Sequence, residues 1–137
     1  MWENLHINRL VSNFLPSSKG RRLLILTGAR QTGKTVLVKR FYNHLPYFNL
    51  DAIEYRDQLS DISSFRWATE IGKAILDEIQ KEASLIDKVK YSFDEGNLDF
   101  SVLTGSSRIL LLKKVRETMA GRIIIRELFP FMFNELI

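Results

Sequence analysis

The sequence has no cysteine and only two histidines, His6 and His44, which lie far apart. The absence of cysteine excludes disulfides and thiolate metal sites and is compatible with a reducing compartment, so we expect a cytoplasmic protein. The two histidines do not form a ligand cluster, and we expect no structural zinc. No apolar run approaches the ~18–20 residues that a membrane helix needs, and the N-terminus lacks the apolar region of a secretory signal. We therefore expect no contact with a membrane.

The remaining composition is that of one folded domain. The 137 residues are 45% hydrophobic and 26% charged, which is ordinary for a globular protein and excludes global disorder. The net charge of +4 is unevenly placed, because residues 1–22 and residues 101–137 each carry +3. Basic ends can indicate nucleic-acid binding, but a net charge of +4 over a whole domain is only weak evidence for it. Solvated helix faces are the simpler interpretation.

Short apolar runs alternate with helical patterns along the chain. Leu23 to Leu26 is continuously apolar between turn signals, which is typical of a strand buried on both faces of a parallel sheet. The expected strands cover residues 23–26, 47–51, 74–76, 100–104 and 123–125. The expected helices cover residues 5–15, 35–45 (ended by Pro46), 85–95 (ended by Gly96) and 107–119, with short helices between 52 and 72. This alternation predicts an α/β fold, a parallel sheet with helices on both faces.

The segment GARQTGKT fits the P-loop pattern G-x-x-x-x-G-K-[ST] at every position. It follows an apolar strand and opens a helix, so its backbone N–H groups can face phosphate oxygens. Lys34 then reaches the β- and γ-phosphates, and the Thr35 hydroxyl supplies an oxygen to Mg²⁺. The predicted nucleotide-binding residues are Gly28, Ala29, Arg30, Gln31, Thr32, Gly33, Lys34, Thr35 and Val36.

Two adjacent acids follow the third expected strand. Asp77 lies 43 residues after Lys34, where a P-loop protein places the acid that holds Mg²⁺ through water. Glu78 is a candidate general base for the attacking water. The alternative is an ordinary surface pair of acids at the end of a strand. The presence of the P-loop motif favours the functional interpretation over this alternative.

Two further side chains are candidates for catalysis. Thr104, at the end of the fourth expected strand, could sense the γ-phosphate or position water. Ser106 is a nearby alternative, although it could simply cap the next helix. Arg122 follows Gly121 before the fifth expected strand and could stabilise transition-state charge in a neighbouring subunit. An exposed arginine at the start of a strand, with no role in catalysis, is an equally good interpretation of Arg122.

These motifs together resemble the AAA+ superfamily, and more narrowly the bacterial and archaeal AAA-domain ATPases whose P-loop reads G-x-R-Q-x-G-K-T. The resemblance implies a P-loop NTPase sandwich with strand order 5-1-4-3-2, ATP as the preferred nucleotide, Mg²⁺, and homo-oligomers. It also implies Lys34 and Thr35 as Walker A, Asp77 and Glu78 as Walker B, Thr104 near sensor 1 and Arg122 as an arginine finger. The matching segments are GARQTGKT (28–35), YFNLD (47–51), ILDEIQK (75–81), LTGSS (103–107) and AGR (120–122).

We expect an ATPase core that binds Mg-ATP and hydrolyses it slowly. In this prediction residues 1–20 form an N-terminal helix and loop, residues 21–137 form the P-loop core, and the C-terminal helical lid of the family is absent. Two alternatives stay open: a non-catalytic interaction module controlled by nucleotide, and a DNA-associated ATPase. A small-molecule kinase is less favoured, because the Asp-Glu pair suits water activation and no basic lid segment is visible.

Overall fold

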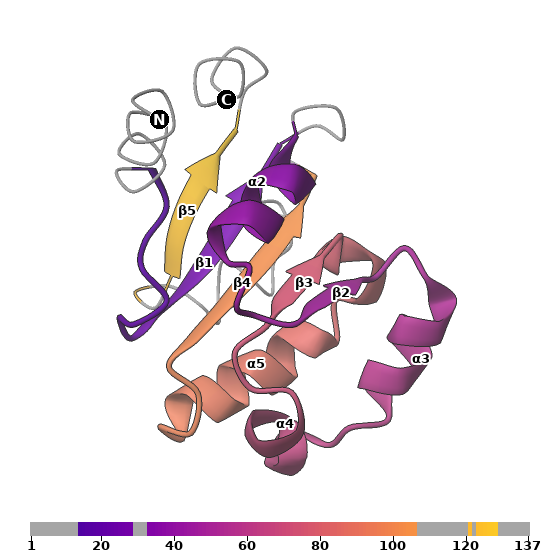
Figure 1. The fold of residues 1–137 in the computed structure, drawn as a ribbon. Helices are drawn as coiled ribbons and strands as arrows, with labels where there is room; N and C mark the ends of the chain where they lie inside the picture. Colours follow the sequence, from indigo (N-terminus) through magenta and orange to yellow (C-terminus); the bar gives the residue numbers. More distant parts are fainter. Residues whose placement is uncertain (1–13, 29–32, 107–120, 122, 129–137) are drawn as a thin grey trace.

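A computed structural model gives the structure, and it describes residues 14–28, 33–106, 121 and 123–128. Strands and helices alternate along the described chain (Figure 1). The strands are β1 (Arg22–Thr27), β2 (Tyr47–Asn49), β3 (Ile75–Asp77), β4 (Phe100–Gly105) and β5 (Ile123–Glu127). The helices are α2 (Lys34–Phe41), α3 (Ile53–Ser60), α4 (Ser64–Glu70), the 3₁₀-helix η2 (Ile79–Glu82) and α5 (Leu85–Asp94). No helix in these described segments is long and apolar enough to cross a membrane.

The five strands form one parallel sheet in the order β2-β3-β4-β1-β5. This is the predicted order 5-1-4-3-2 read from the other edge, so the prediction is confirmed. β4 lies between β1 and β3, which places the end of the P-loop strand near the end of the acidic strand. Asn49 at the end of β2 pairs in register with Asp77 at the end of β3.

The sheet is covered on both faces, as predicted. Leu23 and Ile25 of β1 face one apolar cluster, while Leu24 and Leu26 face the other, because neighbouring strand residues alternate. All four side chains are fully buried, which explains the continuous apolar run in the sequence. α2 packs on the Leu24 side and α3, α4 and α5 pack on the Leu23 side (Figure 1).

Two element boundaries differ from the sequence prediction. α2 ends at Phe41 rather than near Pro46, since Tyr42 leaves helical geometry with φ −110° and ψ 44°. The buried Tyr42 ring packs against Phe100, and its hydroxyl donates to the Pro16 carbonyl at 2.6 Å, so tertiary contacts override the apolar spacing. β2 ends at Asn49 rather than at Asp51, because the Asn49 side chain accepts the Asp51 backbone N–H at 3.0 Å and turns the chain.

The other predicted elements agree with the structure where it describes them. The segment between 52 and 72 forms two short helices, and Gly96 follows α5 with φ +80°. β3 has only three residues, as expected from its short apolar run, and it includes Asp77. The predicted helix over 107–119 and most of the one over 5–15 lie outside the described residues.

The largest buried side chain predicts where stability is most sensitive. Trp67 of α4 is 0% exposed and packs with Leu59 and Val89 in the cluster between the sheet and α5. Trp67→Ala is expected to lower the free energy of unfolding by about 3–5 kcal/mol, because it leaves a cavity in that cluster. Urea denaturation followed by circular dichroism measures this loss. Phe65→Ala is the control, since Phe65 lies in the same helix but is 79% exposed. Equal losses from both variants would contradict the prediction.

Candidate functional site

The candidate site lies at the edge of the sheet where β1, β3 and β4 end (Figure 1). Parallel strands bring their carboxyl ends to one edge, which is where open α/β sheets bind ligands. β1 ends at Thr27, and the N–H of Gly28 donates to the Gly105 carbonyl at the end of β4 at 3.2 Å. Gly33 then begins α2 with φ +84°, a left-handed conformation that favours glycine. The first turn of α2 therefore faces this edge.

Lys34 is the first residue of α2 and is almost completely buried, with 1% of its surface exposed. Its Nζ donates to Glu78 Oε1 at 3.2 Å. A buried lysine requires a charged partner, and Glu78, itself 6% exposed, provides one. The P-loop lysine and the candidate general base are thus ion-paired across 44 positions of sequence.

Asp77 is held by hydroxyl groups from three different elements. Oδ2 accepts hydrogen bonds from Thr35 Oγ1 of α2, at 2.8 Å, and from the Tyr47 hydroxyl of β2. Oδ1 accepts a hydrogen bond from Thr104 Oγ1 of β4. Asp77 is 2% exposed, and no lysine or arginine of the described chain forms an ion pair with it. Neutral donors orient this carboxylate without cancelling its charge.

Glu78 breaks the alternation of strand β3. Consecutive strand residues normally point to opposite faces, so Asp77 and Glu78 would diverge. Glu78 instead has φ 60° and ψ 50°, the only positive φ at a non-glycine residue in the described chain. This conformation costs about 1–2 kcal/mol for an L-residue, and such strain clusters at active sites. Its consequence is that both acids contact side chains of α2, namely Thr35 and Lys34.

Thr104 connects the two acids. Its hydroxyl donates to Asp77 and accepts the backbone N–H of Glu78 at 3.3 Å, and the residue is 0% exposed. Ser106, the alternative from the sequence, forms neither of these contacts. In this structure Thr104 therefore fixes the acidic turn, and the contact with a phosphate or water that the sequence suggested stays a prediction.

Sequence reasoning missed Tyr47 and Gln80. Burial raises the pKa of the Tyr47 hydroxyl, and its hydrogen bond to Asp77 raises that pKa further, so the phenol remains a donor. Gln80 Nε2 donates to Glu78 Oε2 at 2.5 Å. The available signals were weak: Tyr47 begins the strand beside β3, and Gln80 follows the acids by two residues.

A cavity of about 200 Å³ opens beside these side chains. Its lining carries three carboxyl groups, one phenol, one amide and one threonine hydroxyl, and it consists of Thr35, Tyr47, Asn49, Asp51, Asp77 and Glu78. These carboxyl groups do not form a metal cluster by themselves, since no three or more histidine, aspartate or glutamate side chains of the described segments are placed so that they could hold a metal ion together. Mg²⁺ does not need one at phosphate sites, because it keeps several waters and uses one or two carboxylates plus substrate oxygens. The Thr35 hydroxyl and the uncompensated Asp77 carboxylate fit Mg²⁺ in this way.

Several predicted residues lie outside this cluster or outside the described residues. Val36 is 49% exposed in the first turn of α2 and forms no side-chain contact with the acids. Its predicted contribution therefore depends on its backbone. The structure does not describe Ala29, Arg30, Gln31, Thr32 or Arg122, so their predicted roles stay predictions.

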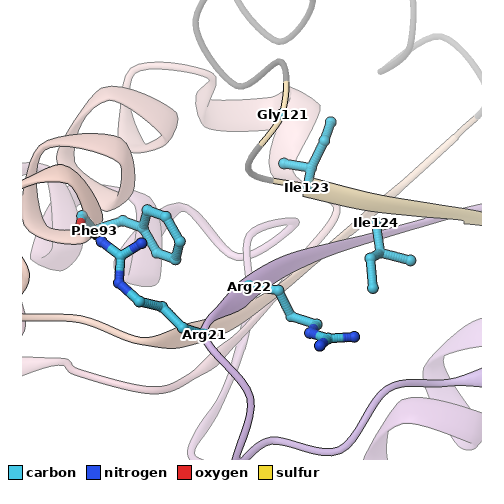
Figure 2. Close-up of a pocket in the computed structure, with 6 residues that line it drawn as sticks. All are labelled: Arg21, Arg22, Phe93, Gly121, Ile123 and Ile124. Atoms are coloured by element: carbon cyan, nitrogen blue, oxygen red, sulfur yellow. Dashed lines mark hydrogen bonds between the residues drawn. The ribbon is translucent and has the colours of Figure 1, made fainter.

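A second hollow, of about 250 Å³, lies at the opposite end of β1 and β5, where both strands begin (Figure 2). The guanidinium of Arg21 lies 4.1 Å from the centre of the Phe93 ring and donates to the Phe93 carbonyl at 2.7 Å. Arg22 points to the other side of the strand in Figure 2. The polar groups of this hollow do not converge, and none of the predicted site residues lines it.

The family model of an AAA domain matches residues 20–137, which is most of the chain. The chain belongs to this AAA-domain family. The predicted AAA+ P-loop fold is thereby confirmed, and membership of this family supports a nucleotide-binding module.

Two individual proteins are also similar to the AAA domain. An uncharacterized protein of Methanocaldococcus jannaschii is 28% identical over 144 residues, covering 91% of this chain and 29% of that protein. The structure of Drosophila ORC bound to AT-rich DNA and Cdc6 matches with 11% identity and a TM-score of 0.43, covering 98% of this chain and 32% of that chain. The chain therefore spans less than a third of the length of either protein.

Proposed function

We propose that this AAA domain binds Mg-ATP at the ends of β1 and β3 and hydrolyses it to ADP and phosphate. One observation carries the proposal: Lys34 and Thr35 of the P-loop helix contact Glu78 and Asp77, respectively, within hydrogen-bond distance. These four side chains come from two segments far apart in the sequence. Together they supply a phosphate-binding cation, two hard oxygen ligands and a carboxylate base.

The P-loop and the first turn of α2 bind the phosphates. The first backbone N–H groups of a helix have no partner within the helix and attract anions. Lys34 exchanges its contact with Glu78 for the β- and γ-phosphates, which carry more negative charge than a single carboxylate. Thr35 and Asp77 would hold Mg²⁺, which would supply positive charge to the phosphate oxygens. This exchange frees Glu78 Oε1.

Glu78 then acts as the general base. A water oxygen attacks the γ-phosphorus, the bond from that phosphorus to the bridging oxygen of ADP breaks, and Glu78 accepts one proton of the water. Thr104 supports this step by holding the Glu78 backbone and the Asp77 carboxylate in one turn. Arg122 of a neighbouring subunit would add charge stabilisation in a homo-oligomer. Residues 21–137 are proposed as the P-loop core that carries all these groups.

Calorimetry and a phosphate-release assay test the proposal together. Binding of ATP is expected to require Mg²⁺ for full affinity and to exceed that of GTP, since the family resemblance favours ATP. Phosphate release in a single turnover separates an enzyme from a nucleotide-controlled interaction module. Absence of ATP binding would refute the proposed function, and binding without any release would favour the module.

Tyr47 provides a test of the Mg²⁺ assignment. Tyr47→Phe removes one of the two hydroxyl groups that orient Asp77 Oδ2. The Mg²⁺ concentration needed for half-maximal nucleotide binding is expected to rise about 10-fold, as for other residues that orient a metal ligand. A fluorescent ADP titrated with Mg²⁺ measures the midpoint. Tyr55→Phe is the control, because Tyr55 is partly exposed on α3 and contacts Phe48 rather than the acids. Unchanged midpoints in both variants would remove Tyr47 from the site.

A further inference from the structure

The two carboxylate oxygens of Glu78 have different partners. Oε1 accepts from Lys34 Nζ at 3.2 Å, and Oε2 accepts from Gln80 Nε2 at 2.5 Å. The partners differ in what else they can bind. Lys34 belongs to the phosphate-binding helix, so bound phosphates compete for it. Gln80 belongs to η2, directly after the acids, and its amide nitrogen has no competing acceptor among the described residues.

The orientation of the Gln80 amide is set by Glu78. A carboxylate only accepts hydrogen bonds, so the NH₂ group of Gln80 must face it and the carbonyl must point away. Gln80 Oε1 is consequently buried and has no hydrogen-bond partner among the described residues. A buried acceptor without a partner is unfavourable. The contact with Glu78 therefore outweighs the loss at the other end of the same amide.

The backbone around Gln80 keeps the amide in place. Glu78 in the left-handed conformation begins η2, which returns the chain so that residue 80 faces residue 78. The intervening Ile79 is 0% exposed and packs in the cluster with Leu76 and Leu85. The strained turn at Glu78 and the buried Ile79, which both precede Gln80, thus fix the backbone from which the amide extends.

We propose that Gln80 is the positioning residue of the general base: it holds Glu78 Oε2 and so presents Oε1 to the attacking water once Lys34 has moved to the phosphates. This inference rests on the proposed hydrolysis and adds the residue that selects which oxygen takes the proton. Without Gln80 the Glu78 carboxylate can rotate about its last bond and keep its contact with Lys34. Oε1 is then no longer oriented toward the attacking water.

The kinetic test uses Gln80→Met, which keeps the length of the side chain and removes the amide. Turnover at saturating Mg-ATP is expected to fall about 10-fold or more, as when an orienting partner is lost, while the Kd of the nucleotide changes less than about twofold. Gln58→Met on the exposed face of α3 is the matched control and is expected to leave both values unchanged. In a Glu78→Gln background, Gln80→Met is expected to have no further effect, because Gln80 acts through Glu78. A wild-type turnover rate in Gln80→Met would overturn the proposal. So would a double variant in which the turnover losses of Gln80→Met and Glu78→Gln multiply.

A second measurement does not depend on turnover. The side-chain amide of Gln80 is identified in ¹H–¹⁵N spectra as the signal missing from Gln80→Met. Glu78→Gln is expected to shift this signal and to speed its exchange with water, because the glutamine keeps its one oxygen for Lys34 and presents to Gln80 an NH₂ group, which cannot accept a hydrogen bond. Adding Mg²⁺ and a non-hydrolysable ATP analogue is expected to leave its exchange slow. If the Gln80 amide signal is the same in Glu78→Gln as in the wild type, the proposed role of Gln80 is wrong. If the contact between Gln80 and Glu78 is present but the protein releases no phosphate, only the proposed hydrolysis is refuted.

Discussion

Replacing Lys34 with alanine is expected to weaken the binding of Mg-ATP by about 100-fold or more. Hydrogen bonds between charged groups contribute about 1.5–3 kcal/mol each, and a P-loop lysine serves two phosphates. Among the described residues the site offers little to replace it, because the side chains that line the cavity beside Lys34 are neutral or acidic. The triphosphate would then meet Asp77 and Glu78 without a cation of the protein between them. Calorimetric titration with Mg-ATP measures the loss.

Folding must be separated from binding in this experiment. Glu78 is nearly buried, and removing one partner of a buried ion pair can cost about 3–5 kcal/mol. Lys34→Met is therefore compared with Lys34→Ala, since it keeps the packing of the lysine stem while removing the same charge. Lys90→Ala is the control for charge alone, because Lys90 pairs with Asp94 on the surface of α5. Wild-type affinity in a folded Lys34→Met protein would show that the nucleotide does not use this lysine.

The strand before the P-loop motif and the helix after it could be predicted from sequence because they depend on local residue types. The P-loop needs glycine where φ is positive, as at Gly33, and a lysine and a hydroxyl at fixed positions beyond it. The run from Leu23 to Leu26 marks a strand with no polar face, which only a sheet covered on both sides can bury. The order of the strands came from family resemblance rather than from these patterns, and the structure agrees with it.

The contacts that organise the acids could not be predicted, because they depend on tertiary packing. Tyr47 reaches Asp77 only because β2 lies beside β3 in the sheet. Gln80 reaches Glu78 only because Glu78 adopts a conformation that is unfavourable for glutamate, and no propensity would suggest it. The end of α2 was missed for a similar reason, since the buried Tyr42 hydroxyl bonds to Pro16 far away in sequence.

In the proposed mechanism, the ion pair between Lys34 and Glu78 links nucleotide binding to catalysis. While the pair is formed, the lysine is partly neutralised and one oxygen of the base is occupied. Phosphates that capture Lys34 free that oxygen in the same event. Under this proposal, Glu78 is available as a base only when the substrate is present. This coupling predicts a loss of turnover without a loss of binding when the charge of Glu78 alone is removed.

Glu78→Gln is accordingly expected to lower ATP turnover by about 10²–10⁴-fold, the usual contribution of a general base. The affinity for Mg-ATP is expected to stay equal or to increase. The amide oxygen of glutamine still accepts from Lys34, so the lysine remains satisfied, but a neutral partner competes with phosphates less strongly than a carboxylate. Single-turnover phosphate release gives the rate, and titration with a fluorescent ATP analogue gives the affinity.

Glu82→Gln is the matched control for this variant. Glu82 lies at the end of the same 3₁₀-helix, but its carboxylate accepts from Ser84 at an exposed position and does not line the cavity. The same change of charge four residues away is expected to leave both rate and affinity near their wild-type values. A large loss of affinity in Glu78→Gln would instead show that the carboxylate binds the nucleotide complex directly. A wild-type rate in that variant would mean that another group takes the proton of the water, because glutamine cannot accept it.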